Sequence, residues 1–200
     1  MYNVSISSLS FRYGRKNIFR DYSADFLGPG LYLLTGPSGC GKTTLFRLIA
    51  GLEIPSSGTI TTSDPVAVSF QEYRLFPTVS ALTNVLAVRR PETKTEAVRN
   101  RAEALALLES LGISENVAAQ LPTELSGGMK QRVSLARALF SLHPIKLLDE
   151  VTKELDPASR NSALDQILRN SESSLILLTT HRPEDLDGLP CTRVSLPQLL

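Results

Sequence analysis

The feature that most constrains this chain is a glycine-rich segment, Gly-Pro-Ser-Gly-Cys-Gly-Lys-Thr, at residues 36–43. A short apolar run precedes it, and a segment of helical periodicity follows it. Glycines let the backbone turn so that successive N–H groups point at a phosphate, and the start of a helix adds its positive end. Lys42 then reaches the β- and γ-phosphates, and the Thr43 hydroxyl binds Mg²⁺. The order strand, glycine loop, helix therefore predicts a phosphate-binding loop; the alternative is a glycine-rich turn with an incidental lysine.

Composition and charge narrow the class of protein. Hydrophobic residues make up 42% and charged residues 20% of the 200 residues, which is ordinary for a soluble globular protein. The formal net charge of +1 gives no electrostatic case for nucleic acid as a partner. No apolar run approaches the roughly 20 residues of a membrane-spanning helix, and residues 1–14 lack the apolar core of a signal peptide. We therefore expect a cytoplasmic protein with no nucleic-acid partner.

Hydrophobic periodicity predicts an α/β fold. Apolar residues at period two indicate strands before residue 28, with an irregularity near Ser7 and Ser8. Short apolar strands alternate with helices again from residue 145 onward, which is typical of a largely parallel sheet covered on both faces. Residues 72–140 interrupt this alternation with helical spacing and are expected to form an inserted helical lobe. One domain is expected over residues 1–200.

Two adjacent acids, Asp149 and Glu150, follow an apolar strand. Asp149 is expected to hold Mg²⁺ opposite Thr43. Because adjacent residues of a strand point to opposite faces, Glu150 cannot duplicate that role, and we expect it to activate water as a general base. A solvated acidic strand end is the alternative.

A second small-residue turn enters a helix at Ser126, Gly127, Gly128 and Met129. Ser126 can cap this helix, and the exposed N–H groups beyond it can form another phosphate site. The alternative is a capped helix start that binds nothing.

Taken together, these motifs resemble the nucleotide-binding domain of ATP-binding cassette (ABC) transporters. Residues 36–43 resemble the Walker A motif, residues 145–149 resemble the Walker B motif, and residues 125–129 are similar to the family signature, with Met129 where Gln is commonest. The remaining matches are the Q-loop at Gln71, the end of the D-loop at Asp156, the switch histidine at His181 and an adenine-stacking aromatic at Tyr13. The motifs follow the family order and cover nearly the whole chain.

The resemblance implies a P-loop NTPase fold with an N-terminal antiparallel β subdomain, and it assigns ATP and Mg²⁺ to particular residues. Nucleotide binding is assigned to Tyr13, Gly36, Pro37, Ser38, Gly39, Cys40, Gly41, Lys42, Thr43, Thr44 and Gln71. Metal binding is assigned to Thr43, Gln71 and Asp149, catalysis to Glu150 and His181, and contacts from a second subunit to Ser126, Gly127, Gly128, Met129 and Asp156. Without this context each residue has another interpretation. Tyr13 would be interpreted equally well as a packed aromatic at a strand end, and Gln71 as an ordinary surface amide. An isolated His181 would more often be a histidine of the core.

The resemblance also implies partners and an activity. Two ATPase subunits, identical or closely homologous, are expected to enclose two ATP molecules head to tail, and their hydrolysis energises a membrane transporter. Transmembrane permease subunits dock on the helical lobe, and an external substrate-binding protein is a further expected partner. The segment after Gln71 carries the docking, unless Leu75 and Phe76 belong to the core of the lobe.

The expected class is a bacterial importer of the nitrate, sulfonate and taurine group, peripheral on the inner face of the cell membrane. A soluble ABC-class ATPase that acts on DNA or on the translation machinery is the alternative. That class is expected to carry a long coiled-coil insertion or a second cassette.

Besides Met129, three residues depart from the family pattern. Val151 stands where Pro is common and lacks its fixed φ, so we expect a looser turn. Lys153 stands where Ser is common and is expected to bring a charge beside the nucleotides. Lys146 interrupts an apolar strand, and we expect its stem to carry the ammonium outward to water.

Overall fold

The computed structural model describes residues 1–197, which form two compact units. Unit 1 comprises Met1–Val68, His143–Asp149 and the described residues from Ser171 onward. Unit 2 comprises Ser69–Leu142 and Glu150–Asn170.

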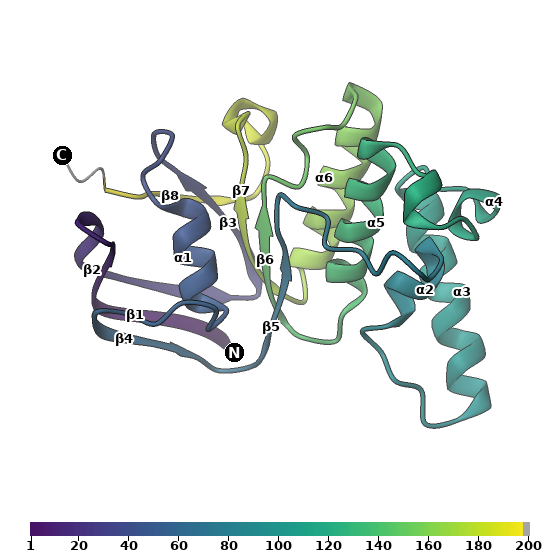
Figure 1. The fold of residues 1–200 in the computed structure, drawn as a ribbon, viewed down its shortest axis with the longest axis horizontal. Coiled ribbons are helices and arrows are strands. Elements are labelled where there is room, and N and C mark those ends of the chain that lie inside the picture. Colours follow the sequence, from purple (N-terminus) through teal and green to yellow (C-terminus); the bar gives the residue numbers. More distant parts are fainter. Residues whose placement is uncertain (198–200) are drawn as a thin grey trace. The chain divides into compact units, whose positions relative to one another are not determined.

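Unit 1 contains an antiparallel three-stranded sheet in the order β2-β1-β4 (Figure 1). Its strands are β1 (Tyr2–Tyr13), β2 (Lys16–Gly28) and β4 (Ser57–Thr62). The predicted irregularity in β1 is confirmed, because Ser8 has a φ of 50° and the register with β2 shifts between Ile6 and Leu9. A Cβ on Gly58 of β4 would lie only 2.3 Å from the carbonyl oxygen of Ser8, so the bulge requires glycine at that position.

A second sheet of five strands has the order β5-β6-β7-β3-β8. Its strands are β3 (Gly30–Thr35), β5 (Val66–Ser69), β6 (Ile145–Asp149), β7 (Leu175–Thr179) and β8 (Thr192–Ser195). The ladders of β3 with β7, β3 with β8 and β6 with β7 are all parallel, and every residue of β6 and β7 is buried. The parallel sheet confirms the predicted α/β class, whereas β8 has no counterpart among the predicted strands.

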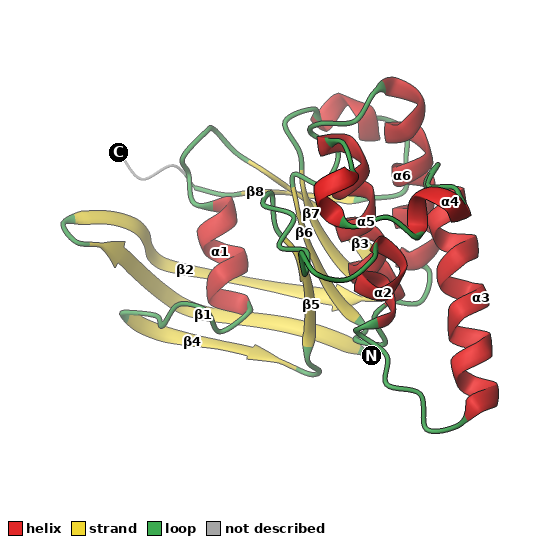
Figure 2. Cartoon of the chain, turned by 45° about the vertical axis from the view of Figure 1, so that its right-hand side comes forward, coloured by secondary structure: helices red, strands yellow, loops and turns green. Residues whose placement is uncertain are grey.

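Helix α1 (Lys42–Ile49) follows β3 through the glycine loop and contacts strands of both sheets, β4 and β6 (Figures 1 and 2). The predicted apolar stripe is present, because Leu45, Leu48 and Ile49 are buried. The predicted short helix after β7 is a 3₁₀ turn, η2 (Pro183–Leu186).

Lys146 in β6 contradicts the expectation that its ammonium reaches water. The residue is only 2% exposed, and its Nζ donates a hydrogen bond of 2.8 Å to the carbonyl oxygen of His143. The outward prediction was wrong because the turn before β6 supplies an internal acceptor, which satisfies the buried donor.

Unit 2 is helical, as predicted for most of residues 72–140. It contains α2 (Ala81–Leu86), α3 (Lys94–Ser110), α4 (Glu115–Ala118), η1 (Pro122–Glu124), α5 (Gly127–Phe140) and most of α6 (Pro157–Ser171). Helices α2, α3 and α5 contact one another, and the fully buried side chains of Ala104 and Leu108 line the inner face of α3.

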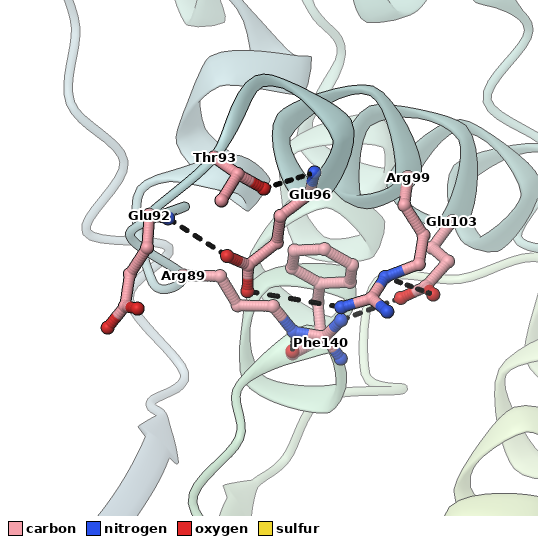
Figure 3. Close-up of polar contacts among 7 residues, drawn as sticks. All are labelled: Arg89, Glu92, Thr93, Glu96, Arg99, Glu103 and Phe140. Carbon is pink, nitrogen blue, oxygen red and sulfur yellow. Dashed lines mark hydrogen bonds and ion pairs between the residues drawn. The ribbon is translucent and has the colours of Figure 1, made fainter.

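Polar contacts fix the start of α3 (Figure 3). The Thr93 hydroxyl accepts a hydrogen bond from the Glu96 N–H, which caps the helix. The Arg89 guanidinium stacks 3.8 Å from the centre of the Phe140 ring, donates to the Phe140 carbonyl and pairs with Glu103 at 2.7 Å. Arg89 therefore links the segment after α2 to both α3 and the end of α5.

Within residues 1–197, none of the helices combines the length and the apolar character needed to cross a bilayer.

Candidate functional site

The glycine loop between β3 and α1 has a shape that only glycine permits at several positions. Gly36, Gly39 and Gly41 have φ values of 146°, 78° and 105°. A Cβ on Gly36 would lie 2.8 Å from the Cys40 Sγ, and a Cβ on Gly41 would lie 2.6 Å from the Cγ2 of Ile18. The predicted loop is thus both left-handed at these glycines and closely packed.

The loop directs its polar groups inward at the start of α1. Gly41 is the N-cap of α1, so no capping side chain occupies the first N–H groups of the helix. Lys42 Nζ donates to the carbonyl oxygens of Gly36 and Pro37, at 2.8 and 3.3 Å, and lies 3.8 Å from the Cys40 Sγ. A helix N-terminus combined with an ammonium folded over the loop provides the donors and the positive charge that a phosphate group requires. Ser38 and Thr44 complete the predicted loop.

The three central strands of the parallel sheet end level with one another. Thr179 of β7 is in register with both Leu34 of β3 and Asp149 of β6. The glycine loop, Asp149 and His181 therefore follow or end neighbouring parallel strands at the carboxyl edge of the sheet, where α/β proteins bind ligands.

Asp149 is 1% exposed, and its two carboxylate oxygens have different surroundings. Oδ1 accepts a hydrogen bond of 2.6 Å from the Thr179 hydroxyl, whereas Oδ2 is buried and has no hydrogen-bond partner in the part of the chain that the structure describes. A buried, unpaired carboxylate oxygen is costly, and a bound cation would satisfy it.

The incompletely paired carboxylate of Asp149 thus fits a bound cation such as Mg²⁺. Among residues 1–197 no group of three or more His, Cys, Asp or Glu side chains is placed to bind a metal. Mg²⁺ requires no such cage, since it usually takes one or two protein ligands together with substrate phosphates and waters.

His181 lies two residues beyond β7 and is exposed, so the alternative of a core histidine is wrong. The Thr180 hydroxyl accepts a hydrogen bond of 3.0 Å from the Arg182 N–H and shapes the turn that carries the imidazole.

Tyr13, at the end of β1, is 45% exposed. Its hydroxyl donates to Glu53 at 3.1 Å, and Glu53 also pairs with Arg47 at 3.0 Å. The Phe11 ring packs edge-on against it, with the ring centres 4.9 Å apart. The tyrosine is therefore held at its hydroxyl and against one aromatic neighbour while much of its surface stays open.

The second small-residue turn lies in unit 2, and its predicted cap is confirmed. The Ser126 hydroxyl accepts a hydrogen bond of 3.3 Å from the Met129 N–H. A Cβ on Gly127 would lie 2.7 Å from the Glu154 carboxylate, and a Cβ on Gly128 would lie 3.2 Å from the Glu154 carbonyl oxygen. Both glycines therefore lie close to Glu154, and a side chain at either position would require that residue to shift.

Glu150 lies beyond the end of β6 with a φ of 54°, so the argument from alternating strand faces does not apply to it. Its carboxylate lies 3.7 Å from the Lys153 ammonium, and its carbonyl accepts a hydrogen bond from the Lys153 N–H. Val151 is fully buried. Burial of the valine side chain gives the turn an apolar anchor, and the expected loosening stays a prediction.

Asp156 and Gln71 also lie in unit 2. Asp156 accepts hydrogen bonds from the Ser159 N–H at 3.0 Å and the Ser159 hydroxyl at 2.7 Å, which lower the pKa of its carboxyl and cap α6. Gln71 is exposed after β5. Phe76 in the same segment is 54% exposed, so its assignment to the core of the lobe is wrong.

Sequence reasoning missed three contacts of these residues: Thr179 on Asp149, Glu53 on Tyr13 and Glu154 against Gly127. Thr179 alone had a local signal, because it is a polar residue at the end of an otherwise apolar strand. The catalytic, metal-binding and nucleotide-binding roles assigned to all of the predicted site residues remain predictions.

Comparisons with known proteins agree with this architecture. The sequence pattern of the ABC transporter family matches residues 20–153. The thiamine import ATP-binding protein ThiQ of Mesorhizobium japonicum is 36% identical over 196 residues, covering 91% of this chain and 76% of that protein. ThiQ of Brucella abortus is 35% identical over 203 residues, covering 94% and 83%. The narrower likeness to nitrate, sulfonate and taurine importers stays a prediction.

A solved structure confirms the fold. The dimeric, post-hydrolysis state of the ATP-binding cassette MJ0796, bound to ADP and Pi, superposes with a TM-score of 0.83 at 23% identity, covering 98% of this chain and 94% of that one. The family match spans more than half of the chain, and the sequence relatives cover nearly all of it. This chain belongs to the ABC transporter family, as one of its nucleotide-binding ATPase subunits.

Proposed function

We propose that this chain binds and hydrolyses ATP with Mg²⁺ to drive an importer of the bacterial type. The observation that carries the proposal is that three neighbouring parallel strands, β3, β7 and β6, end at the same level of the sheet. The glycine loop, His181 and the incompletely paired carboxylate of Asp149 lie at these strand ends. The name of the ThiQ relatives supports import, and a thiamine-like cargo is the corresponding hypothesis for the whole transporter.

Each residue has a distinct role in the proposed reaction. The N–H groups of residues 36–44 and Lys42 bind the phosphates, and Tyr13 stacks on the adenine. Thr43, Asp149 and Gln71 would hold Mg²⁺, which when bound neutralises charge on the β- and γ-phosphates. Glu150 orients the attacking water and accepts its proton, and His181 donates a hydrogen bond to the γ-phosphate.

The proposed assembly needs a second ATPase subunit. Ser126, Gly127, Gly128 and Met129 of one copy, with its Asp156, would complete the ATP site of the other, because their capped helix start offers a second set of N–H donors. We propose that both units belong to a single cassette domain, consistent with a family match that runs through both.

Permease subunits are the membrane partners of this family of transporters, and we propose that they dock on the segment that follows Gln71. The exposed Phe76 supports this, because a large aromatic gains stability when a partner covers it. Peripheral attachment to the inner face of the membrane, and an external protein that delivers the cargo, follow from the same proposal.

Replacing the proposed base tests the mechanism. Glu150→Gln is expected to lower kcat for phosphate release by at least about 100-fold, because general-base catalysis contributes roughly 10²–10⁴, while binding of ATP is retained. Glu109→Gln, an exposed glutamate of α3, is the matched control and is expected to keep the parent rate. An unchanged rate in Glu150→Gln would remove this residue as the base. Purification of the tagged chain together with its partners distinguishes transport from a soluble role. Transmembrane permease subunits that co-purify would support transport, and a purely soluble complex would count against it.

A further inference from the structure

We propose that Tyr73 is a positioning residue for ATP hydrolysis, because its hydroxyl links the segment after Gln71 to Glu154, in the turn that carries Glu150. The proposal rests on the function proposed above, and it concerns contacts within unit 2.

Tyr73 is held at both of its ends. Its hydroxyl donates a hydrogen bond to the Glu154 carboxylate, and its carbonyl accepts a hydrogen bond of 3.2 Å from the Arg137 guanidinium of α5. These two hydrogen bonds tie the residue both to the turn at residues 150–156 and to α5.

The linked pair also lies against the start of α5. A Cβ on Gly127 would lie 2.7 Å from the Glu154 Oε2 and 3.2 Å from the Tyr73 Oη. Gly127 directly follows Ser126, the capping residue of α5. One hydrogen bond thus brings together three segments, and each of them has its own proposed role. These roles are metal binding near Gln71, proton transfer at Glu150 and the contact to the second subunit at Ser126.

The turn at residues 150–156 has other anchors that maintain its fold. Val151 is fully buried, the Arg160 guanidinium donates to the Leu155 carbonyl at 2.9 Å, and Asp156 caps α6. Loss of the Tyr73 hydroxyl should therefore leave the fold in place and change only how firmly this turn is held relative to the segment after Gln71. Small displacements of reacting groups lower turnover more than they lower binding.

The link also connects the proposed docking segment to the reaction. Phe76 lies three residues beyond Tyr73 and is exposed. A shift of this segment when a permease binds would be transmitted through the Tyr73 hydroxyl to Glu154, and from there to both the base turn and the start of α5.

The test is steady-state hydrolysis by the full chain, assembled with its permease, carrying Tyr73→Phe. The ring is kept and only the hydroxyl is lost. We expect kcat to fall roughly tenfold, less than the roughly 100-fold that a full 1 Å misplacement can cost, while KM for ATP and the thermal unfolding midpoint stay at the parent values. Tyr2→Phe, which removes the hydroxyl of a tyrosine in unit 1, is the control and should leave all three unchanged.

Variants at Glu154 complete a double-mutant cycle. Glu154→Ala should reproduce the loss in kcat, Glu154→Gln should restore most of the rate because its amide oxygen still accepts the hydrogen bond, and the double variant Tyr73→Phe with Glu154→Ala should be no slower than either single variant. An unchanged kcat in Tyr73→Phe, additive losses in the double variant, or a rate loss matched by a lower unfolding midpoint would overturn the link. A parent assembly that hydrolyses no ATP would instead overturn the proposed function itself.

Discussion

The two small-residue turns of this chain look alike in sequence, yet they need glycine for different reasons. In the loop before α1, glycine supplies left-handed backbone, and the helix begins without a capping side chain. In the turn before α5, Ser126 caps the helix, and Gly127 and Gly128 make room for Glu154. In the first turn the left-handed backbone itself favours glycine, whereas in the second turn only the contact with a distant segment does.

This difference has a consequence for the chemistry. The glycines of the first loop and Ile18, which packs against Gly41, all lie in unit 1, so the proposed phosphate site needs no partner chain for its shape. The turn before α5 depends on the position of residues 150–156. Its donors are therefore sensitive to whatever moves that turn, which suits the completion of a site on a second subunit.

The largest expected loss of stability comes from replacing a glycine of the first loop, and it should differ between Gly41 and Gly39. Gly41→Ala combines a φ of 105° with a Cβ that would lie 2.6 Å from Ile18, so it should lower the free energy of unfolding by about 3 kcal/mol, the sum of backbone strain and overpacking, and weaken ATP binding more than tenfold. Gly39→Ala has a φ of 78° but meets no described atom within 4 Å, so backbone strain of about 1 kcal/mol is expected alone. Urea unfolding without nucleotide measures both, and equal losses would contradict the packing argument.

An intermediate effect is expected at the second turn, where a neighbour can relieve the strain. Gly127→Ala should lower the free energy of unfolding, because its methyl group would lie 2.7 Å from the Glu154 carboxylate. Adding Glu154→Ala should recover about 1 kcal/mol, the size of coupling found between residues in contact. Gly39→Ala combined with Glu154→Ala is the control and should be additive. If the Gly127 pair is additive as well, the two turns do not differ in the way proposed.

The smallest effect concerns the caps of the two helix starts in unit 2. Ser126→Ala should lower the free energy of unfolding by about 1 kcal/mol at any pH between 3 and 7, because a hydroxyl cap does not titrate.

Asp156→Ala should lower the free energy of unfolding at pH 7, and this loss should become smaller in acid. The folded-state pKa of Asp156 is lowered by its bonds to Ser159, so its contribution is full above about pH 4 and is lost as the pH falls through the folded-state pKa. Denaturant unfolding at several pH values checks both, and a cost that does not change with pH for Asp156→Ala would count against its role as a charged cap.

Much of the fold was predictable because its signals are local. Buried parallel strands such as β6 and β7 are continuous apolar runs, and the glycines around α1 mark where the backbone must turn. Strand β8 has no such signal, since Thr192, Arg193 and Ser195 are exposed and only pairing with β3 makes the segment a strand. The buried ammonium of Lys146 was unpredictable for a different reason: its acceptor is a backbone carbonyl of the preceding turn, which the identity of no side chain reveals.

The site shows the same division. The spacing of the sequence motifs predicted a glycine loop before α1 and an acid at the end of β6, and the structure has both. The positive φ of Glu150 and the contact of Tyr73 with Glu154 were not predictable, because a strand pattern does not reveal where the chain leaves the sheet, and 81 residues separate the two partners. Interactions between distant segments are decided by tertiary packing, and one sequence alone contains no record of them.

The placement of β3 has a consequence for the order of biosynthesis. This strand lies at residues 30–35, yet its two neighbours in the sheet are β7 and β8, at residues 175–179 and 192–195. While the chain emerges from the ribosome, β3 and the loop behind it must wait for roughly 140 further residues before either edge is paired. An unpaired apolar strand is prone to aggregation, so the nascent chain should depend on chaperones for longer than its modest size suggests.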